Sequence, residues 1–377
     1  MIYLDNAASS GHKPASVIKA VNHALRFYSA NPGRSGHSLS VLCAMEIYKA
    51  RKAVKELVNA QSENDVCFTM NCTHAINSVL YGVLSRGDHI IISSLEHNAV
   101  WRPVKALESN EGIEVSVAKV DMFDDDITVK NFENLVRKNT KMIFVTSASN
   151  VFGRRLPLDR LGALCKEKGI LFGVDAAQGV GHFEIDVQKL AIDYLCIAPH
   201  KGLYAPAGLG VLVAQRPIER VLILGGTGVN SIEVQQPEEL PERIESGTIN
   251  IPGILGMKAG IDFVKKRGIS KIENQENTLI GYAHKSLARI GAELYTSYPS
   301  KDLFAPVLSF NIKGFASDKI GDELNKWGIA VRTGLHCAPL AHSQNGTLTR
   351  GTVRISPCLF NTHTDIEKLI FVAKKLI

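Results

Sequence analysis

The middle of this chain alternates between short apolar runs and longer amphipathic segments, and this alternation limits the folds that it can adopt. Between residues 66 and 214, the apolar runs have the length and composition of strands, and segments with helical periodicity separate most of them. Strands that alternate with helices in this way predict an α/β fold with a mostly parallel, doubly wound sheet. The predicted strands span residues 66–69, 89–93, 114–120, 141–146, 171–174, 194–198 and 209–214.

Polar residues repeatedly follow these predicted strands. In open parallel sheets, ligands bind in the crevice beyond the carboxyl ends of the strands, so side chains placed there are candidates for a site. Each of these residues, taken separately, could be an ordinary turn residue, but together they would line one edge of one sheet. They are Thr73, His97, Asn150, Asp175, Gln178, His200 and Lys201.

Lys201 and Asp175 form the most informative pair in this set. Lys201 follows an apolar run that stops at Pro199, and small residues surround it. A lysine that loses solvent in a site has a lowered pKa and can form a Schiff base, while a carboxylate opposite it can keep a pyridine nitrogen protonated. The pair therefore favours a pyridoxal 5′-phosphate site. The alternatives are a surface loop lysine for Lys201 and a helix N-cap for Asp175.

A smaller α+β unit is predicted after the sheet. The stretch 243–252 is polar and rich in helix breakers, and a long helix follows from about residue 253 to 266. We place the domain boundary there, with a large domain over 14–252 and a small domain formed by 1–13 and 253–377. Other helices are predicted at 14–28, 39–59, 75–84, 129–138, 159–168, 269–291, 318–327 and 364–376, and strands at 307–312, 329–332 and 351–356.

Composition limits the functions open to this chain. The net charge is +6 and the basic residues are spread along the chain, so no nucleic-acid partner is expected. No apolar run is long enough to cross a bilayer and no charged-then-apolar leader is evident, so we expect no membrane association and a cytoplasmic location. The seven cysteines form no CxxC pair and no zinc spacing, which predicts neither a disulfide framework nor a metal site. Cys67, Cys165 and Cys196 lie in apolar surroundings and are expected to be inert core thiols.

Cys337 differs from the other cysteines. It follows a predicted strand and precedes residues 341–350, which we expect to form an exposed loop because they are rich in Ser, Gln, Asn, Gly and Thr. Arg332 and His336 would supply positive charge that favours the nucleophilic thiolate. The alternative is a spectator surface cysteine. Arg354, on the next predicted strand, is a candidate for binding a substrate carboxylate, unless it is a surface arginine paired with an acid.

Seven short motifs are spread over nearly the whole chain. They are LDNAASS at 4–10, EHNAVW at 96–101, SNVFG at 149–153, DAAQ at 175–178, HK at 200–201, SGTIN at 246–250 and RTGLHCAP at 332–339. In identity, order and spacing they resemble the motifs of the cysteine desulfurases and selenocysteine lyases, which are fold-type I pyridoxal-phosphate enzymes of aminotransferase class V. The last motif resembles the group II, or Suf-type, branch of this family.

The resemblance implies a set of residues around the cofactor ring. Lys201 would carry the cofactor as a Schiff base, and His97 would stack on its pyridine ring. Asp175 would pair with the ring nitrogen. Gln178 and Asn150 would contact the phenolic oxygen of the ring.

The resemblance also implies a phosphate site. Thr73 and His200 would hold the phosphate, joined by Thr248 from a second subunit, so a homodimer is expected. Thr73 as a plain N-cap of the following helix is the alternative. The chain departs from the family pattern here, because Ala198-Pro199 replaces the usual Ser-Gly before the HK pair and Cys72 stands where Thr is common.

On the substrate side, the resemblance implies that Arg354 binds the carboxylate, that Cys337 accepts sulfur, and that Arg332 and Asn31 shape the pocket. The implied activity is conversion of L-cysteine to L-alanine with a persulfide on Cys337, which is then passed from a flexible loop to an acceptor protein or reduced by thiols. The rivals are a lyase acting on L-selenocysteine, a class V aminotransferase, and a non-catalytic scaffold for sulfur assembly.

Overall fold

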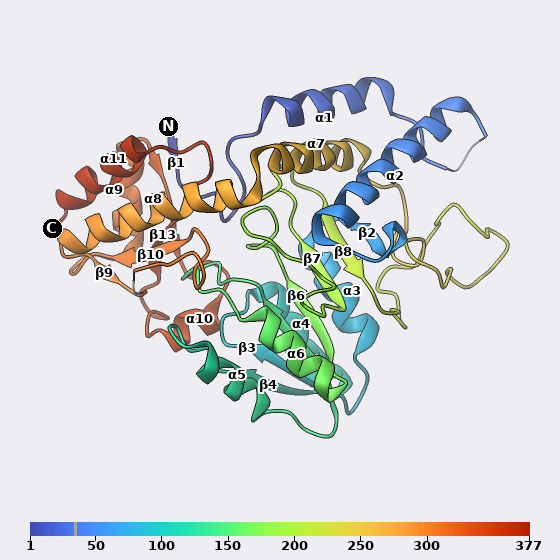
Figure 1. Ribbon diagram of the computed structural model, residues 1–377, viewed down its shortest axis with the longest axis horizontal. Coiled ribbons are helices and arrows are strands. Elements are labelled where there is room, and N and C mark those ends of the chain that lie inside the picture. Colours follow the sequence, from blue (N-terminus) through green and yellow to red (C-terminus); the bar gives the residue numbers. More distant parts are fainter. Residues whose placement is uncertain (34–35, 297) are drawn as a thin grey trace.

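A seven-stranded sheet lies at the centre of the computed structural model, which describes residues 1–33, 36–296 and 298–377 (Figure 1). Its strands are β2 (Val66–Thr69), β3 (His89–Ser93), β4 (Glu114–Ala118), β5 (Thr140–Thr146), β6 (Leu171–Asp175), β7 (Tyr194–Ile197) and β8 (Gly210–Ala214). They lie in the order β2-β8-β7-β6-β5-β3-β4. The five strands from β7 to β4 in this order are parallel, and β8 is antiparallel to β7 and β2. The predicted mostly parallel sheet is therefore confirmed.

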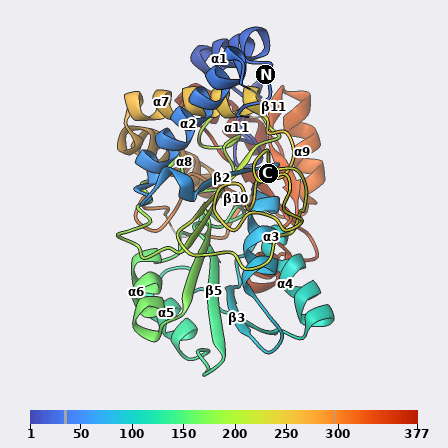
Figure 2. The same cartoon turned by 90° about the vertical axis from the view of Figure 1, so that its right-hand side faces the viewer.

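Helices cover both faces of this sheet, as expected for a doubly wound fold. Figure 2 shows α5 (Asp125–Glu133) and α6 (Leu158–Lys168) on one side of the strands, and α3 (Cys72–Val83) and α4 (Asn98–Glu111) on the other. Because two layers of helices enclose them, β3, β7 and β8 are buried along their whole length, which explains their continuous apolar sequences. β4, at the edge, alternates between buried and exposed residues near its end.

A group of three helices lies beyond the β2 side of the sheet. The helices are α1 (Ala15–Phe27), α2 (Ser38–Val58) and α7 (Ile251–Arg267), and α7 packs against the other two (Figure 1). A short 3₁₀ helix, η1 (Glu63–Asp65), precedes β2. Two glycines allow α7 to approach the backbone that follows Lys201: a Cβ on Gly260 would lie 1.9 Å from the Leu203 carbonyl oxygen, and one on Gly256 would meet Pro206.

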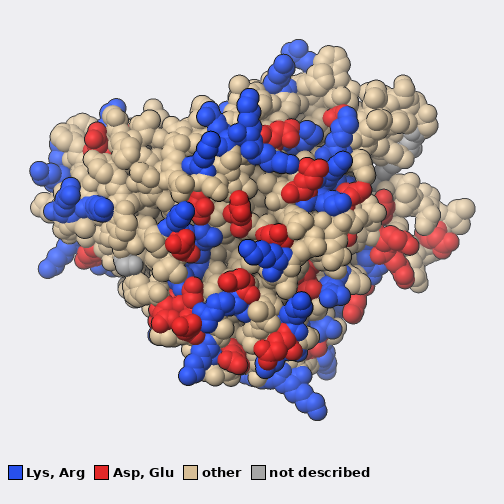
Figure 3. All heavy atoms as spheres, viewed as in Figure 1, with Lys and Arg blue, Asp and Glu red and all other residues tan. Residues whose placement is uncertain are grey.

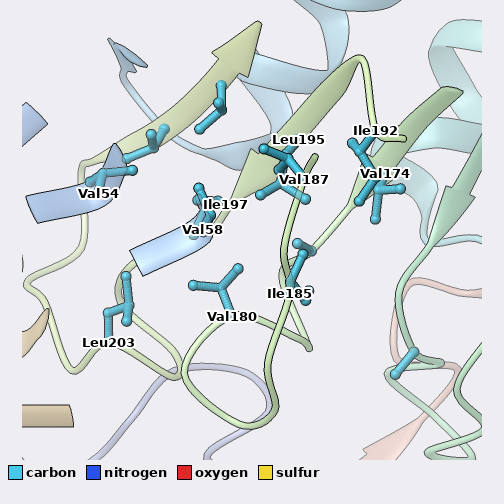
Figure 4. Packing of buried hydrophobic residues seen from close by; sticks show 14 of the residues in the cluster. Val54, Val58, Val174, Val180, Ile185, Val187, Ile192, Leu195, Ile197 and Leu203 are labelled. Atoms are coloured by element: carbon cyan, nitrogen blue, oxygen red, sulfur yellow. The ribbon is translucent and has the colours of Figure 1, made fainter. Parts of the chain in front are cut away.

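The segment on which α7 presses is itself part of the core. Figure 4 shows Leu203 beside Val180, Ile197 and Val58, with all four side chains in one apolar cluster. The connection after Lys201 is therefore held between α7 on one side and the core on the other. This packing leaves the turn that carries Lys201 little room to move.

A second, smaller unit contains the C-terminal elements. Its antiparallel sheet has the order β12-β13-β10-β9, and β1 pairs separately with β11. The unit has its own hydrophobic cluster, distinct from the clusters around the large sheet. Its elements are β1 (Ile2–Tyr3), α8 (Ile269–Arg289), β9 (Glu293–Leu294), β10 (Leu308–Asn311), α9 (Ser317–Lys326), β11 (Ile329–Ala330), β12 (Arg332–Gly334), β13 (Thr352–Ile355) and α11 (His363–Lys374).

The predicted division of the chain before residue 253 separates α7 from the helices on which it packs. The buried residues of α7 belong to the same cluster as the large sheet, whereas Leu4 belongs to the cluster of the smaller unit. This packing favours a division after α7. The domain division itself stays a proposal.

One sequence prediction in this unit is wrong. Residues 341–350 do not form a single exposed loop, because α10 (Pro339–Gln344) extends into this stretch and Ala341 and His342 are fully buried. Pro339 fits the first helical position, where a missing N–H costs nothing, and the alanines on either side of it pack into the large cluster. The strand predicted over 329–332 is also divided, because β11 and β12 pair in different sheets.

Two further features concern the charges on the surface and the apolar character of the helices. On the face drawn in Figure 3, basic and acidic side chains are interspersed. Among the residues that the structure describes, no helix combines the length and the apolar character that crossing a membrane requires.

We expect Gly260→Ala to destabilise the protein by about 1–3 kcal/mol, because the added methyl group would overlap the Leu203 carbonyl. Helix propensity alone predicts the opposite effect, an increase in the stability of the protein by about 1 kcal/mol. Urea denaturation of the wild type and the variant measures the difference. Lys266→Ala, on the exposed part of α7, is the control and should change stability by less than about 0.5 kcal/mol. A Gly260→Ala variant as stable as the wild type would contradict the close contact.

Candidate active site

A cavity of about 220 Å³ lies at the edge of the large sheet where the parallel strands end. β2 runs in the same direction as β7, since both are antiparallel to β8, so the start of α3 also faces this edge. Residues from the smaller unit complete the wall. The predicted site residues that line the cavity are Thr73, His97, Asn150, Asp175, Gln178, His200, Lys201, Arg332 and Arg354.

Lys201 lies in the turn that follows β7. Its backbone N–H donates to the Ala198 carbonyl at 3.1 Å, which closes the turn. Among the described residues, its ammonium group makes no hydrogen bond or ion pair. Burial lowers the pKa of Lys201, while the nearby charge of Asp175 acts in the opposite direction. The amine is thus held in an environment that favours its neutral, nucleophilic form.

Asp175 is the last residue of β6, the strand next to β7, and its side chain is buried. Its Oδ1 accepts the Ala177 N–H at 2.9 Å, and the Cys72 sulfur lies 3.7 Å from the same oxygen. Burial raises the pKa of Asp175, against lowering by the Ala177 hydrogen bond and by Lys201. The residues after Asp175 form a turn, so the alternative of a helix N-cap does not apply.

His97 is fixed by the helix that it begins. Its Nδ1 accepts the Ala99 N–H at 3.0 Å, as the N-cap of α4, so the ring proton lies on Nε2. Burial, together with Lys201, lowers the pKa of His97 to about 4. The ring is therefore neutral at pH 7 and presents a defined orientation to the cavity.

Glu96, beside His97, is buried on the opposite side of this turn. Its Oε1 accepts the Thr146 N–H at 2.9 Å and the Ser93 hydroxyl, while its Oε2 has no partner among the described residues. Burial raises the pKa of Glu96 to about 8. A neutral carboxylic acid therefore ties the segment that carries His97 to the end of β5.

The start of α3 offers donors to an anion. The N-cap is Asn71, whose side-chain oxygen accepts the His74 N–H at 2.9 Å, so Thr73 is not the N-cap that the sequence left as an alternative. Thr73 lies in the first turn, where its hydroxyl is exposed. Within the described part of the chain, the backbone amides of Cys72 and Thr73 donate to no other group. Free amides at a helix N-terminus suit a phosphate.

His200 lies on the other side of the same cavity. Its Nδ1 is 3.1 Å from the Ser9 hydroxyl, and burial, helped by Lys201, lowers the pKa of His200 to about 4. A neutral histidine still carries one N–H that can bind a phosphate oxygen. Ser9 and Ser10 also donate to the His200 carbonyl, which holds the N-terminal segment over the turn.

Arg354 is fully buried on β13, so it is not the surface arginine left as an alternative. One guanidinium nitrogen donates to the Asn150 carbonyl at 2.9 Å, and another forms an ion pair with Asp5. Its Nε has no partner among the described residues. Asp5 is a site residue that the sequence analysis missed; the LDNAASS motif contained it, but nothing in the sequence indicated its partner.

Gln178 and Asn150 are both engaged with the backbone. Gln178 Nε2 donates to the Ala7 carbonyl at 2.8 Å, and Asn150 Nδ2 donates to the His336 carbonyl at 2.8 Å. Each residue therefore lines the cavity and also anchors a neighbouring segment. The carbonyl oxygens of their side chains take no part in these bonds.

Cys337 lies next to the cavity rather than on its wall. Its side chain is exposed, and an Arg332 guanidinium nitrogen is 3.6 Å from its sulfur. His336, in contrast, does not supply the positive charge that the sequence suggested, because burial lowers the pKa of His336 to about 2. Arg332 is thus the cation that faces the thiol. As expected, Cys67, Cys165 and Cys196 are buried, and burial raises the pKa of each.

Asn31 and Thr248 lie away from this cavity. Both are exposed, and Asn31 lines a second cavity of about 270 Å³ together with Gly247 and Ile249, the neighbours of Thr248. The two predicted site residues are therefore close to each other in this chain but not to Lys201. Residues 34 and 35, which follow Asn31 closely, are outside the described residues.

The comparisons with known proteins agree with this geometry. A family model described as aminotransferase class-V matches residues 2–369. The chain belongs to the class-V aminotransferase family. This family uses pyridoxal 5′-phosphate, as the sequence predicts.

Individual members of the family match over their whole length. A probable cysteine desulfurase of Pyrococcus abyssi is 33% identical, with 100% of this chain and 94% of that protein covered. A cysteine desulfurase of Salmonella dublin is 32% identical, with 98% and 92% covered. The apo structure of a cysteine desulfurase from Thermococcus onnurineus NA1 has a TM-score of 0.92 at 30% identity, with 100% and 94% covered. The fold is that of the fold-type I pyridoxal-phosphate enzymes, as predicted; assignment to the Suf-type branch stays a prediction.

The polar groups around the cavity of this protein fit pyridoxal phosphate. A lysine whose ammonium group has no partner within the described residues and a buried carboxylate lie at the ends of adjacent strands, which suits an aldehyde and a pyridinium nitrogen. The free amides at the start of α3 and the His200 ring suit the phosphate. The buried Ala198 and Pro199 supply no hydroxyl, so the phosphate site depends on the remaining donors.

We expect Glu96→Gln to flatten the pH dependence of stability. The pKa of Glu96 is raised from 4.5 to about 8 by burial, so between these values the folded protein keeps a proton that the unfolded chain releases. Wild-type stability should therefore fall as the pH rises through this window, by at most about 1.4 kcal/mol per pH unit, and the loss should be complete above pH 8. The variant lacks this loss and should be the more stable protein at pH 8.

Apparent urea midpoints from pH 5 to 8.5 measure the effect on the cofactor-loaded protein. Glu184→Gln is the control, because Glu184 is exposed and its removal should leave the wild-type profile unchanged. Parallel profiles for the wild type and Glu96→Gln would contradict a buried, protonated Glu96.

Proposed function

We propose that this protein is a pyridoxal-phosphate-dependent cysteine desulfurase that converts L-cysteine to L-alanine and takes the sulfur onto Cys337. The observation that carries the proposal is the exposed Cys337 thiol beside the Lys201 cavity, with the cavity residue Arg332 3.6 Å from its sulfur. A transaminase needs no thiol at this position. The names of the full-length relatives support the same activity.

The buried arginine supports an amino-acid substrate. Asn150 and Asp5 hold the terminal nitrogens of Arg354, so the guanidinium is fixed in place at the wall of the cavity. A positioned cation of this kind binds a carboxylate. Arg332, on β12 at the mouth, adds a second positive charge on the side of Cys337.

Lys201 has two tasks in this proposal. It would hold the cofactor, and its amine would accept the proton from the substrate α-carbon. The bound cofactor supplies an electron sink for that carbon. The lowered pKa of Lys201 favours the neutral amine that proton transfer requires.

Sulfur transfer is the step that belongs to Cys337. The Cys337 sulfur attacks the sulfur of the substrate, a sulfur–sulfur bond forms, and the bond between the substrate sulfur and its β-carbon breaks. The β-carbon then takes up a proton. The balance is L-cysteine plus the Cys337 thiol giving L-alanine plus a Cys337 persulfide, and it needs no external oxidant or reductant.

We also propose a homodimer in which Thr248 and Asn31 reach the cavity of the second copy. Both residues are exposed and lie together, away from the cavity of their own chain. Nearby apolar side chains of α2 are also exposed, including Leu42, Met45 and Tyr48, with exposed fractions of 49–51%. Exposed apolar surface of this extent is typical of an interface. Sedimentation at micromolar concentration tests the dimer.

The sulfur acceptor and the location are further parts of the proposal. A persulfide on an exposed thiol can be transferred to an acceptor protein or reduced by a small thiol. All seven cysteines are unpaired, which suits a reducing compartment such as the cytoplasm.

We expect Cys337→Ala to lose alanine formation from L-cysteine by about 100-fold or more, while it keeps the absorbance of the bound cofactor, because only the sulfur nucleophile is removed. The assay compares alanine formed from L-cysteine and from L-selenocysteine. Because selenium leaves more readily, the selenocysteine activity should be less affected. Cys43→Ala, which removes a buried thiol in α2, is the matched control and should keep both activities.

Three results would contradict the proposal. Full turnover of L-cysteine by Cys337→Ala would exclude Cys337 as the sulfur nucleophile. Formation of a keto acid instead of alanine by the wild type would favour the aminotransferase. A wild type that acts on L-selenocysteine but barely on L-cysteine would favour the lyase.

A further inference from the structure

The turn that carries Cys337 has an unfavourable backbone conformation. His336 and Cys337 have φ angles of 50° and 57°, in the left-handed region. For residues with a side chain this conformation is unfavourable, so two in succession persist only where surrounding contacts hold them. The structure therefore must contain groups that hold the cysteine in this turn.

Three backbone contacts provide part of this support. Asn150 Nδ2 donates to the His336 carbonyl at 2.8 Å, and the Asn98 N–H donates to the Cys337 carbonyl at 2.7 Å. The Ala338 N–H closes the turn on the Leu335 carbonyl at 2.9 Å. These bonds fix the peptide groups on both sides of the thiol, but none of them fixes the His336 side chain.

A chain of buried side chains holds the His336 ring. His336 Nδ1 lies 3.4 Å from His342 Nε2, and the two rings are stacked with an interplanar angle of 14°. His342 Nδ1 lies 2.7 Å from the Thr347 hydroxyl. His336 Nε2 lies 3.4 Å from the Arg332 carbonyl. His342 and Thr347 are almost fully buried, on and just after α10.

The direction of each hydrogen bond follows from the last acceptor. A carbonyl oxygen can only accept, so His336 Nε2 carries a proton and its Nδ1 is the acceptor. In this assignment His342 Nε2 donates to His336, and His342 Nδ1 accepts from the Thr347 hydroxyl, which also lies 3.4 Å from the His342 carbonyl oxygen. Both rings are neutral, since burial lowers the pKa of His336 to about 2 and that of His342 to about 4.

We propose that His342 and Thr347 are positioning residues for sulfur transfer: through His336 they hold Cys337 in its left-handed turn, with its thiol beside Arg332. This inference rests on the proposed function, because it assigns a task to residues outside the cavity through the thiol of Cys337. Neither residue lines the cavity, and the short helix α10 places the His342 ring against His336.

The arrangement separates two parts of the reaction. The cofactor residues, Lys201 and Asp175, lie at the ends of β7 and β6 and do not depend on α10. The thiol depends on α10 through the chain from Thr347 to His336. Breaking this chain should therefore impair the attack of sulfur on sulfur while the cofactor remains bound.

Thr347→Val and Thr347→Ser test the proposal as a matched pair. Valine keeps the shape and removes the hydroxyl that donates to His342, whereas serine keeps the hydroxyl. In the cofactor-loaded protein, Thr347→Val should lower kcat for L-cysteine by about tenfold with KM changed by less than about twofold, and Thr347→Ser should stay within about twofold of the wild type.

L-selenocysteine separates positioning from general damage. Thr347→Val should lose no more activity on this substrate than Cys337→Ala loses, because only the function of the thiol is affected. A larger loss would indicate collapse of the whole site and would overturn the proposal. Equal kcat values for the valine and serine variants on L-cysteine would overturn it as well.

A second pair tests the direction of the chain. In His342→Gln, the amide nitrogen of glutamine can replace Nε2 and donate to His336, whereas in His342→Asn the shorter side chain reaches only toward Thr347. We expect His342→Gln to retain several times more activity on L-cysteine than His342→Asn, with unchanged cofactor absorbance in both. The reverse order would contradict the assigned proton positions.

Amide hydrogen exchange provides a readout that does not depend on catalysis. Peptides that contain Asn98 and Ala338 should exchange faster in Thr347→Val than in Thr347→Ser, because both amides donate within or onto the turn. Unchanged exchange would overturn the inference. If the wild type forms no alanine from L-cysteine, the proposed function fails by itself, and the exchange measurement still decides whether Thr347 holds the turn.

Discussion

The site depends on the meeting of Lys201 and Asp175 at the ends of two adjacent parallel strands. β6 and β7 pair directly, so a carboxylate at the end of one and a lysine in the turn after the other are brought together by the sheet itself. Burial penalises the charge of each group, and each charge partly offsets the penalty on the other. An aspartate or a lysine alone at this place would be driven toward its neutral form. The α7 glycines and the core around Leu203 keep the lysine turn against the sheet.

The smaller unit turns this sheet edge into a cavity. Arg354 and Arg332 come from its antiparallel sheet. Asn150, in the turn after β5, accepts from Arg354 through its backbone and donates to the His336 carbonyl through its side chain. One residue thus joins the carboxylate site to the cysteine turn. The position of the Cys337 thiol relative to Lys201 is therefore set by contacts between the two units rather than by either unit alone, and in the proposed reaction a small shift between them would misalign the thiol.

Sequence patterns predicted the helices and strands whose signal is local. Prediction failed where tertiary contacts decide the conformation or the protonation of a residue. Strand ends could be located from apolar runs followed by polar residues, which is why Asp175 and Lys201 were identified together. α10 was missed because six residues rich in polar side chains carry no helical periodicity, and their burial follows from the core against which they pack. The neutral state of His336 was missed for the same reason, since its pKa is lowered by burial that no motif reveals. Asp5 lies in a motif, but its partner Arg354 is 349 residues away.

The N-terminal segment closes the cavity with the part of the chain that is synthesised first. β1 pairs with β11, the Ala7 N–H donates to the Ser356 hydroxyl at 2.8 Å, and Asp5 pairs with Arg354. A ribosome makes the chain in the direction from N-terminus to C-terminus, so β1, Asp5 and the Ala7 N–H lack these partners until residues 329–356 have emerged. The last strand of the large sheet ends at Ala214, and that sheet can form well before then. The contacts of residues 2–7 with the smaller unit therefore form only after the large sheet has been made.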